Sequence, residues 1–139
     1  MVTYGNPYGT LPTPIRTGYT FNGWKYQNNF ITSSTVVTTE TNHTLIADWS
    51  VNQYIVTFIS DGNTVSTTNI NYGDKYSNFP TVNKEGYIFN GWKNANGATI
   101  TSNSNMVVAE DHSLTAEWLP FSYTIIFNGN GDDGTGAMT

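Results

Sequence analysis

The chain has 139 residues, a net charge of −5 and a pI near 4.6. Its 5 basic residues are scattered and form no patch, which argues against binding to nucleic acid or to an anionic membrane surface. Cysteine is absent, which excludes disulfides, thiol catalysis and cysteine-ligated zinc. Aromatic residues make up 14% of the chain and charged residues 11%, a composition that favours strands and turns over helices.

A sequence repeat organises the chain. Residues 2–25 are identical to residues 70–93 at 12 of 24 positions, and residues 31–62 to residues 100–131 at 10 of 32. The repeat length of about 69 residues indicates small units of one kind, which depend on large aromatic side chains and on their neighbours for stability. No signal peptide and no apolar run of about 18 residues occurs, so we expect any export or anchoring signal to lie outside this segment.

The first strand signals lie in the first 26 residues. Residues 2–5 are expected to end a strand, and the proline-rich stretch 6–17 to form an extended loop. In residues 19–26 the aromatic side chains share one strand face only if Asn22 and Gly23 form a bulge. A hairpin turn at Asn22-Gly23 is the alternative.

The next stretch is polar and ends in a second strand. Residues 27–42 are expected to contain one short helical turn capped by Ser33-Ser34-Thr35. Residues 43–49 alternate between polar and apolar side chains and predict a closing strand. Its inward residues are Leu45, Ala47 and Trp49, and their counterparts in the next unit are Leu114, Ala116 and Trp118.

The clearest strand of the chain is residues 54–60. Asp61-Gly62 is a hairpin signal that leads into a second strand at 65–72. The leading strand recurs at 123–127 and is followed by a glycine-rich stretch. Each full unit therefore predicts a hairpin, a proline-containing loop, an aromatic strand, a polar excursion and a closing strand.

These elements resemble the internalin-type B repeat, also called the Listeria–Bacteroides repeat, of bacterial surface proteins. The pattern consists of Tyr-x-Val-x-Phe at 54–58, Asp61-Gly62, Tyr72-Gly73, Pro80, Gly-Tyr-x-Phe-x-Gly-Trp at 86–92 and Leu-x-Ala-x-Trp at 114–118. The resemblance implies a mainly β (α+β) fold of tandem small β-grasp, ubiquitin-like units. The loop after Pro80 departs from the first unit, because it lacks a second proline equivalent to Pro14.

The register of this family divides the chain into three parts. Residues 2–49 are an incomplete first repeat without its leading strand, 50–118 are a complete repeat, and 119–139 hold the leading strand and turn of a following repeat. An incomplete sheet exposes an unpaired edge that a strand can join. The hypothesis is that Tyr123, Ile125 and Phe127 of one molecule complete the first unit of another; the alternative is a cropped array with frayed ends.

The candidate sites for chemistry are weak. His43 and His112 have equivalent positions and no nucleophile motif beside them, so a structural role is favoured. The oxygen-rich stretch with Asn128, Asn130, Asp132 and Asp133 is a calcium candidate, with a flexible turn as the favoured alternative. We therefore expect no catalytic residue, no metal and no cofactor.

The lysines after the two tryptophan motifs raise a second question of chemistry. Lys25 and Lys93, each near an Asn-Gly pair, allow the hypothesis of a lysine–asparagine isopeptide bond, which also needs a nearby carboxylate. Sequence alone does not place these three groups together.

Aromatic residues are assigned to the core or to binding. A carbohydrate-stacking platform is one interpretation of the tryptophans, but small units need large buried rings. The predicted core residues are Tyr19, Phe21, Trp24, Trp49, Tyr54, Phe58, Tyr87, Phe89, Trp92 and Trp118. Tyr8 and Tyr76, in the proline-containing loops, are the candidate exposed binding residues.

These features predict a non-enzymatic repeat segment of a secreted bacterial protein located at the cell surface or cell wall. It would act as a stalk or spacer in adhesion, with neighbouring repeats or copies of itself as partners. The alternative is a direct binding module for a host protein or glycan. Neither interpretation involves nucleic acid or insertion of this segment into a membrane.

Overall fold

The computed structural model describes residues 1–131, and this part of the chain contains strands and no helix. The strands are β1 (Tyr19–Tyr26), β2 (Asn29–Ile31), β3 (Ile46–Val51), β4 (Gln53–Ser60), β5 (Asn63–Asn71), β6 (Tyr87–Lys93), β7 (Thr99–Ile100) and β8 (His112–Pro120). The mainly β prediction is therefore confirmed. Within these 131 residues there is no helix that could cross a membrane.

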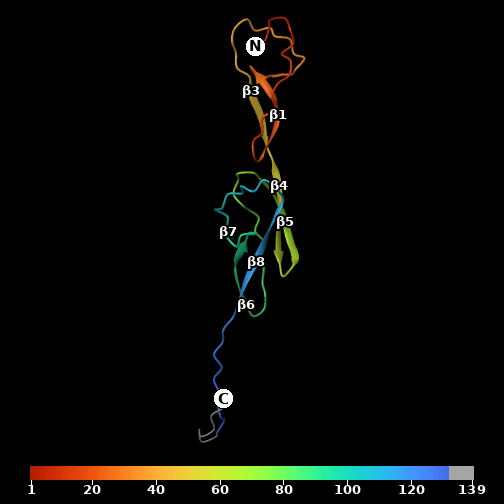
Figure 1. Cartoon of the computed structure of the whole chain (residues 1–139). Helices are drawn as coiled ribbons and strands as arrows, with labels where there is room; N and C mark the ends of the chain where they lie inside the picture. The colour runs from red at the N-terminus through yellow and green to blue at the C-terminus, as the bar shows by residue number, and fades with distance from the viewer. Residues whose placement is uncertain (132–139) are drawn as a thin grey trace.

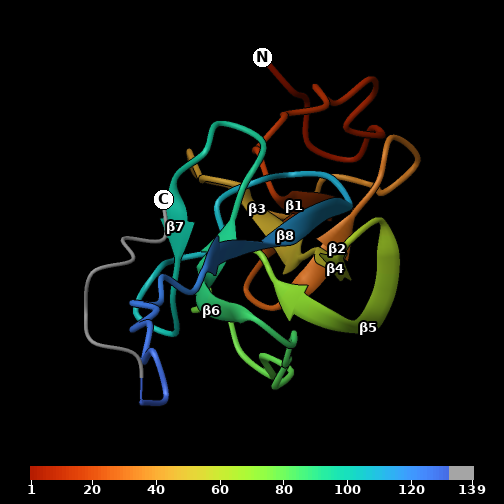
Figure 2. The same ribbon diagram turned by 90° about the horizontal axis from the view of Figure 1, so that it is seen from below.

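The strands form two sheets placed end to end. The first sheet has the order β2-β1-β3, and the second has the order β5-β4-β8-β6-β7. The two sheets lie one above the other in an elongated molecule, with the N-terminus at one end and the segment that follows β8 at the other (Figure 1). Seen from below in Figure 2, β1 and β3 project onto β4 and β8, as expected for units stacked along one axis.

Each aromatic strand contains the predicted bulge. The β1–β3 register shifts between Phe21 and Gly23, and the β6–β8 register shifts between Phe89 and Trp92. Gly23 has a φ of 140° and Gly91 a φ of 99°, a backbone conformation that side chains with a Cβ rarely adopt. The bulge prediction is confirmed, and the alternative hairpin turn at Asn22-Gly23 is wrong.

The β4–β5 hairpin forms where the sequence predicts it. Asp61 and Gly62 have φ values of 50° and 78°, and a type I′ turn requires positive φ at both central residues. β4 also pairs with β8 in parallel, from Val56 opposite His112 to Ile59 opposite Thr115. β4 is thus a central strand of the second sheet.

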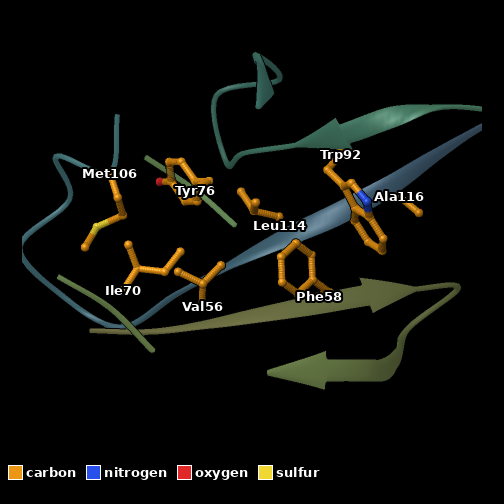
Figure 3. Packing of buried hydrophobic residues seen from close by; sticks show 8 residues of the cluster. All are labelled: Val56, Phe58, Ile70, Tyr76, Trp92, Met106, Leu114 and Ala116. Carbon is orange, nitrogen blue, oxygen red and sulfur yellow. The ribbon is translucent and has the colours of Figure 1, made fainter. Parts of the chain in front are cut away.

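The main core lies on one face of the second sheet. Figure 3 shows its eight buried residues, with Phe58 of β4 facing Trp92 of β6. The two rings meet edge to face with centroids 5.0 Å apart. The members are Val56, Phe58, Ile70, Tyr76, Trp92, Met106, Leu114 and Ala116. Among residues 1–51, Val37 is the one buried hydrophobic residue.

Two predicted strands do not form among the described residues. Residues 2–5 and 123–127 have no strand conformation, and β3 begins at Ile46 instead of at residue 43. A strand needs a hydrogen-bonded neighbour, and residues 43–45 and 123–127 pair with no strand among residues 1–131. Residues 2–5 make one such bond, from the Gly5 N–H to the Val37 carbonyl, which is too few for a strand. The predicted helical turn at residues 33–35 is also wrong. A tight turn stands there, closed by the Thr35 N–H donating to the Thr32 carbonyl at 3.1 Å.

The predicted aromatic core needs correction at two residues. Tyr87 is 38% exposed and Phe89 is 37% exposed, because both lie toward the end of β6 that pairs with Trp118 and Pro120, where they line an open pocket beyond the buried core. Phe58 and Trp92 are buried. The other predicted core residues are half-buried: Tyr19, Phe21, Trp24, Trp49, Tyr54 and Trp118.

Candidate functional site

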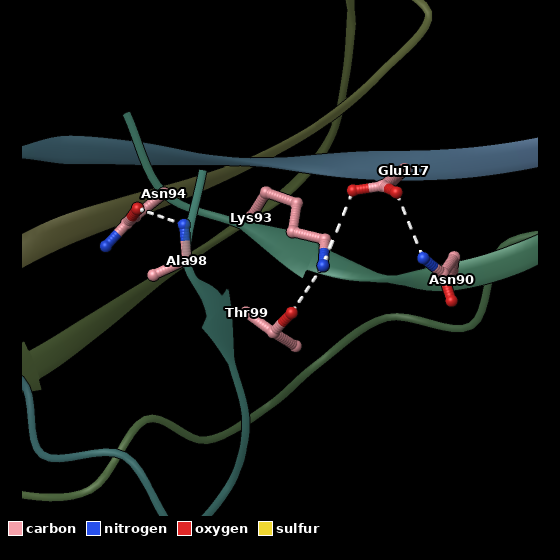
Figure 4. A network of polar contacts seen from close by, with 6 residues as sticks. All are labelled: Asn90, Lys93, Asn94, Ala98, Thr99 and Glu117. Carbon is pink, nitrogen blue, oxygen red and sulfur yellow. Dashed lines mark hydrogen bonds and ion pairs between the residues drawn. The ribbon is translucent and has the colours of Figure 1, made fainter. Parts of the chain in front are cut away.

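Each bulge carries a cluster of polar side chains that joins the aromatic strand to the closing strand. In the second unit Asn90 Nδ2 donates to Glu117 Oε1 at 3.0 Å, and Lys93 Nζ lies 3.4 Å from Glu117 Oε2 (Figure 4). Lys93 Nζ also donates to Thr99 Oγ1 of β7. One carboxylate therefore receives two donors from β6, and the lysine extends the network to the edge strand.

The first unit has the same cluster with aspartate in place of glutamate. Asn22 Nδ2 donates to Asp48 Oδ2 at 3.0 Å, and Lys25 Nζ lies 3.0 Å from Asp48 Oδ1. In both units the asparagine of the bulge and the lysine that follows it contact a carboxylate of the closing strand. The cluster is therefore a repeated feature of the unit.

These clusters bring together the three groups that an isopeptide bond requires, but in the wrong ionisation state. Hydrogen bonding from Asn90 and then the pairing with Lys93 lower the pKa of Glu117, and Asn22 and Lys25 do the same for Asp48. Bond formation needs a neutral amine and a protonated carboxyl group, whereas a lowered carboxyl pKa favours the carboxylate. The Lys93 and Glu117 side chains are also 20% and 40% exposed to water. The arrangement suits an ion pair.

The histidines pair with the tyrosines of the proline-containing loops. Tyr76 Oη lies 2.8 Å from His112 Nε2, and His112 Nδ1 lies 2.9 Å from the Glu110 carbonyl oxygen. Because a carbonyl only accepts, Nδ1 carries a proton, and in the neutral ring Nε2 then accepts from the tyrosine hydroxyl. His43 repeats this with Tyr8 at 2.6 Å. Sequence reasoning missed both pairs, although each tyrosine and each histidine recurs at an equivalent repeat position.

The assignment of Tyr8 and Tyr76 as exposed binding residues is corrected. Tyr76 is 3% exposed and Tyr8 is half-buried, because each ring packs edge to face on its histidine. Burial raises the pKa of the Tyr76 hydroxyl. These tyrosines hold the loops onto the units. Tyr76 offers no open face to a ligand, whereas Tyr8 lines part of an open cavity.

The calcium candidate is only partly within the described residues. Asn128 and Asn130 lie in an exposed turn, where the Asn130 N–H donates to Asn128 Oδ1 at 2.9 Å. Asp132 and Asp133 lie outside the described residues. Residues 1–131 contain no group of three or more histidine or carboxylate side chains that could hold a metal ion.

The first unit contains an open cavity of about 580 Å³, lined by apolar side chains and by polar ones such as Glu40, Asn42 and His43. Its walls include Val2, Tyr8, Val37 and Leu45. The equivalent residues of the second unit are core residues packed around Val56 and Phe58: Ile70, Tyr76, Met106 and Leu114. The cavity thus lies where the second unit has β4.

The two units meet at a joint built around Gly18. The Asn52 N–H donates to the Gly18 carbonyl at 2.9 Å, and the Tyr72 N–H donates to the Asn52 carbonyl at 2.9 Å. A Cβ on Gly18 would lie 2.2 Å from the Tyr72 ring, so only glycine allows this approach. Arg16 covers the ring of Tyr19 at 3.7 Å, beside the same joint.

Comparisons with known proteins agree with this repeated architecture. A family model described as the Listeria-Bacteroides repeat domain matches residues 1–48 and 54–117. A protein of Evansella cellulosilytica named "Putative membrane protein" is 30% identical over 98% of this chain. A second protein of that organism, named "Putative Gly-rich membrane protein", is 32% identical over 89% of this chain.

The chain spans 21% of the first relative and 15% of the second. It therefore corresponds to a short section of those proteins. With matches to both halves and the repeated bulge, cluster and tyrosine–histidine pair in each, the chain belongs to the Listeria–Bacteroides repeat domain family.

Proposed function

We propose that this chain is a non-enzymatic spacer segment of a bacterial cell-surface protein. In this proposal tandem β-grasp units of about 69 residues form a stalk that holds an adhesive region away from the cell. The repeated family match and the names of the relatives support a surface location. In this proposal the partners of each unit are the neighbouring units, and the chain is located outside the cell.

The observation that carries the proposal is the joint at Gly18. Two backbone hydrogen bonds and the close packing of Tyr72 on Gly18 connect the units, and Asn52 alone separates β3 from β4. Such nearest-neighbour contacts favour a semi-rigid rod, because each unit is positioned by the one before it. The end-to-end arrangement of the sheets is consistent with that role (Figure 1).

The strand order supports the assignment to a β-grasp. Counted within the second unit, its strands follow the order 2-1-5-3-4, with the first and last strands parallel at the centre. Among the described residues the unit lacks the helix that ubiquitin-like members carry. The segment between β5 and β6 instead packs Tyr76 and Phe79 onto the sheet.

The spacer proposal is tested by length. Chains with one, two, three and four copies of residues 50–118 would be compared by small-angle X-ray scattering. We expect the maximum dimension to rise by a constant increment with each copy. Compact particles whose dimension does not follow copy number would contradict a stalk.

The direct binding module is tested in parallel. Saturable binding of the same chains to a glycan array or to host-cell proteins, with an affinity independent of copy number, would favour that alternative. The buried position of Tyr76 removes one of the two residues on which that alternative relied.

A further inference from the structure

A groove of about 440 Å³ lies within the second unit. Three segments line it: the proline-containing loop at residues 79–82, strand β6 and residues 99–102. The sheet beside it is complete, with β4, β5, β6, β7 and β8 all in place. The lining residues are also separate from the joint at Gly18. The groove is therefore a feature of the whole repeat.

The lining of the groove is neutral and largely apolar. Its polar side chains are hydroxyls, such as those of Thr101 and Ser102, and none of the described residues that line it carries a charge. Its apolar residues are Phe79, Pro80, Val82, Phe89, Trp92 and Ile100. A concave site with apolar walls and a few polar groups is typical of ligand binding. The composition favours a neutral ligand, because a buried charge would find no partner here.

The indole N–H of Trp92 is a hydrogen-bond donor at this groove. Trp118 Nε1 donates to Ser60 Oγ at 3.1 Å, whereas Trp92 Nε1 makes no hydrogen bond within residues 1–131. Trp92 is 3% exposed, yet these residues contain no fully buried side-chain nitrogen without a partner. The Nε1 atom is therefore reached from outside, through the groove that Trp92 lines. A ligand that binds there needs an acceptor for this donor.

The first unit shows which acceptor suits a tryptophan at this position. Trp24 Nε1 donates to the Pro12 carbonyl at 2.8 Å. Pro12 belongs to residues 11–15, which read Leu-Pro-Thr-Pro-Ile, and Val82 replaces the second proline of that stretch in the second unit. The loop of the second unit makes no corresponding bond to Trp92 among the hydrogen bonds of residues 1–131. A proline carbonyl is thus an acceptor that this indole position already uses.

The groove has a smaller side chain at its edge strand than the first unit has. Phe30 of β2 and Thr99 of β7 occupy equivalent positions in the strand pairing. A Cβ on Gly23 would lie 3.0 Å from the Phe30 ring, whereas a Cβ on Gly91 would lie 3.2 Å from the Thr99 methyl group. The Thr99 hydroxyl accepts from Lys93 (Figure 4). The second unit therefore carries a methyl group where the first unit carries a ring.

We propose that this groove binds an extended, neutral, proline-containing segment of another protein, with Trp92 Nε1 donating to a proline carbonyl. Proline has no backbone N–H, so it brings an acceptor into an apolar site without a donor that would need a partner. Its polyproline II conformation is preformed, and aromatic-lined grooves recognise it. The segment comes from another protein because the Pro12 carbonyl of this chain already accepts from Trp24.

The first test follows the indole signals of the full chain by NMR. The probe is the blocked peptide Leu-Pro-Thr-Pro-Ile, the sequence of residues 11–15. We expect a saturable shift of the Trp92 indole N–H signal, while the Trp24 signal stays in place because its N–H is already bonded. The peptide with alanine in place of both prolines should bind roughly tenfold more weakly.

Three results would overturn the proposal. The first is the absence of a saturable shift at Trp92, and the second is equal binding of the alanine peptide. The third is a shift caused by a neutral oligosaccharide of N-acetylglucosamine but not by the proline peptide, which would assign the groove to a glycan.

The second test closes the groove. Thr99→Phe places there the side chain that the first unit carries at the equivalent position. Thr99 is exposed, so the unit should still fold. We expect peptide binding to weaken by roughly tenfold or more, because the ring would fill space that the ligand needs.

The matched control for closing the groove is Thr67→Phe. It makes the same change at an exposed residue of β5 outside the groove, and it should leave peptide binding unchanged. Equal affinities of Thr99→Phe and Thr67→Phe would contradict the site. Failure of these tests would leave the spacer proposal unaffected, since that proposal rests on the joint within one chain.

Discussion

The two units share one sequence motif but differ in how completely their aromatic side chains are enclosed. Trp92 of the second unit is 3% exposed and contacts both Phe58 and Phe89. Trp24 of the first unit keeps the contact with Phe21 at the same 5.5 Å, contacts no equivalent of Phe58 among residues 1–131 and is half-buried. The aromatic strand and the closing strand therefore assemble without β4, and β4 supplies the residues that close the core.

This difference has a thermodynamic meaning. Burying a large apolar side chain stabilises a protein by about 1.5–3 kcal/mol, so a unit without Val56 and Phe58 lacks a substantial share of its core energy. Most of the loop hydrogen bonds recur in both units, such as Gly5 N–H to the Val37 carbonyl and Gly73 N–H to the Met106 carbonyl. Loop geometry thus depends on local contacts, whereas core burial depends on the leading strand.

The largest expected effect comes from one leucine in each unit. Leu114 is fully buried, so Leu114→Ala should destabilise the second unit by about 2–5 kcal/mol. Its equivalent Leu45 lines the open cavity, and Leu45→Ala should cost on the order of 1 kcal/mol in the first unit. Urea unfolding followed by the indole N–H signals of Trp24 and Trp92 reports each unit separately. Equal losses would mean that the first unit has a closed core in solution.

The next largest loss of stability is expected from replacing one glycine in each unit by alanine. Gly18 and Gly86 have φ values of 80° and 81°, so alanine at either position carries the same left-handed strain of about 1–2 kcal/mol. Only Gly18→Ala also clashes with Tyr72, where the added Cβ would lie 2.2 Å from the ring. We expect an additional loss of about 1–3 kcal/mol for Gly18→Ala and a looser joint.

The comparison of the two glycine variants isolates the joint, because their backbone strain is shared. Thermal unfolding gives the stability difference. Small-angle scattering at a concentration that keeps the chain monomeric gives the change in overall dimension. Identical behaviour of the two variants would show that Tyr72 does not hold the units together.

Local patterns in the sequence predicted the elements that depend on near neighbours. The bulge was predictable because Trp24 and Phe21 have opposite strand parity, and the β4–β5 hairpin because Asp61-Gly62 suits a turn with positive φ. The family resemblance placed the same motifs in order. These features need only a few adjacent residues to form.

Contacts between distant segments could not be predicted in the same way. The pairing of Tyr76 with His112, and of Glu117 with Asn90 and Lys93, depends on how loops and strands return to each other in space. A strand pattern also does not provide a partner, which is why Tyr123–Phe127 has strand-forming residues but no strand conformation. The alternation of polar and apolar residues shows which face of a strand can be buried. Whether that face is buried depends on another segment that packs against it.

The polar clusters at the bulges give a smaller effect that depends on pH. The pKa of Glu117 is lowered in the folded chain, chiefly by hydrogen bonding from Asn90, so the unfolded chain binds this proton at a higher pH. The resulting stability is present above the unfolded pKa, near 4.5, and is lost as the pH falls through the lower folded pKa. Glu117→Gln should therefore make the stability of the second unit less steeply dependent on pH below about 4.5.

Thermal unfolding between about pH 3 and pH 6 would measure that slope. Glu85→Gln, an exposed glutamate outside the network, is the matched control and should keep the slope of the natural chain. Asp48→Asn makes the same change in the first unit, where the pKa of Asp48 is also lowered. An unchanged slope in Glu117→Gln would mean that the network does not persist in solution.

The same clusters give a final prediction in which no change is expected. An isopeptide bond between lysine and asparagine releases one molecule of ammonia, so each bond lowers the intact mass by that amount. The carboxylate stays charged and paired in both units, and water reaches the lysine side chains, which are 33% exposed for Lys25 and 20% for Lys93. We expect intact-mass spectrometry to give the full mass of the sequence. A mass lower by one ammonia would show that the bond had formed in one unit and not in the other, and that the polar cluster of the reacting unit excludes water. The variants Asp48→Asn and Glu117→Gln would then identify which unit, because removing the carboxylate should restore the full mass only in the unit that reacts.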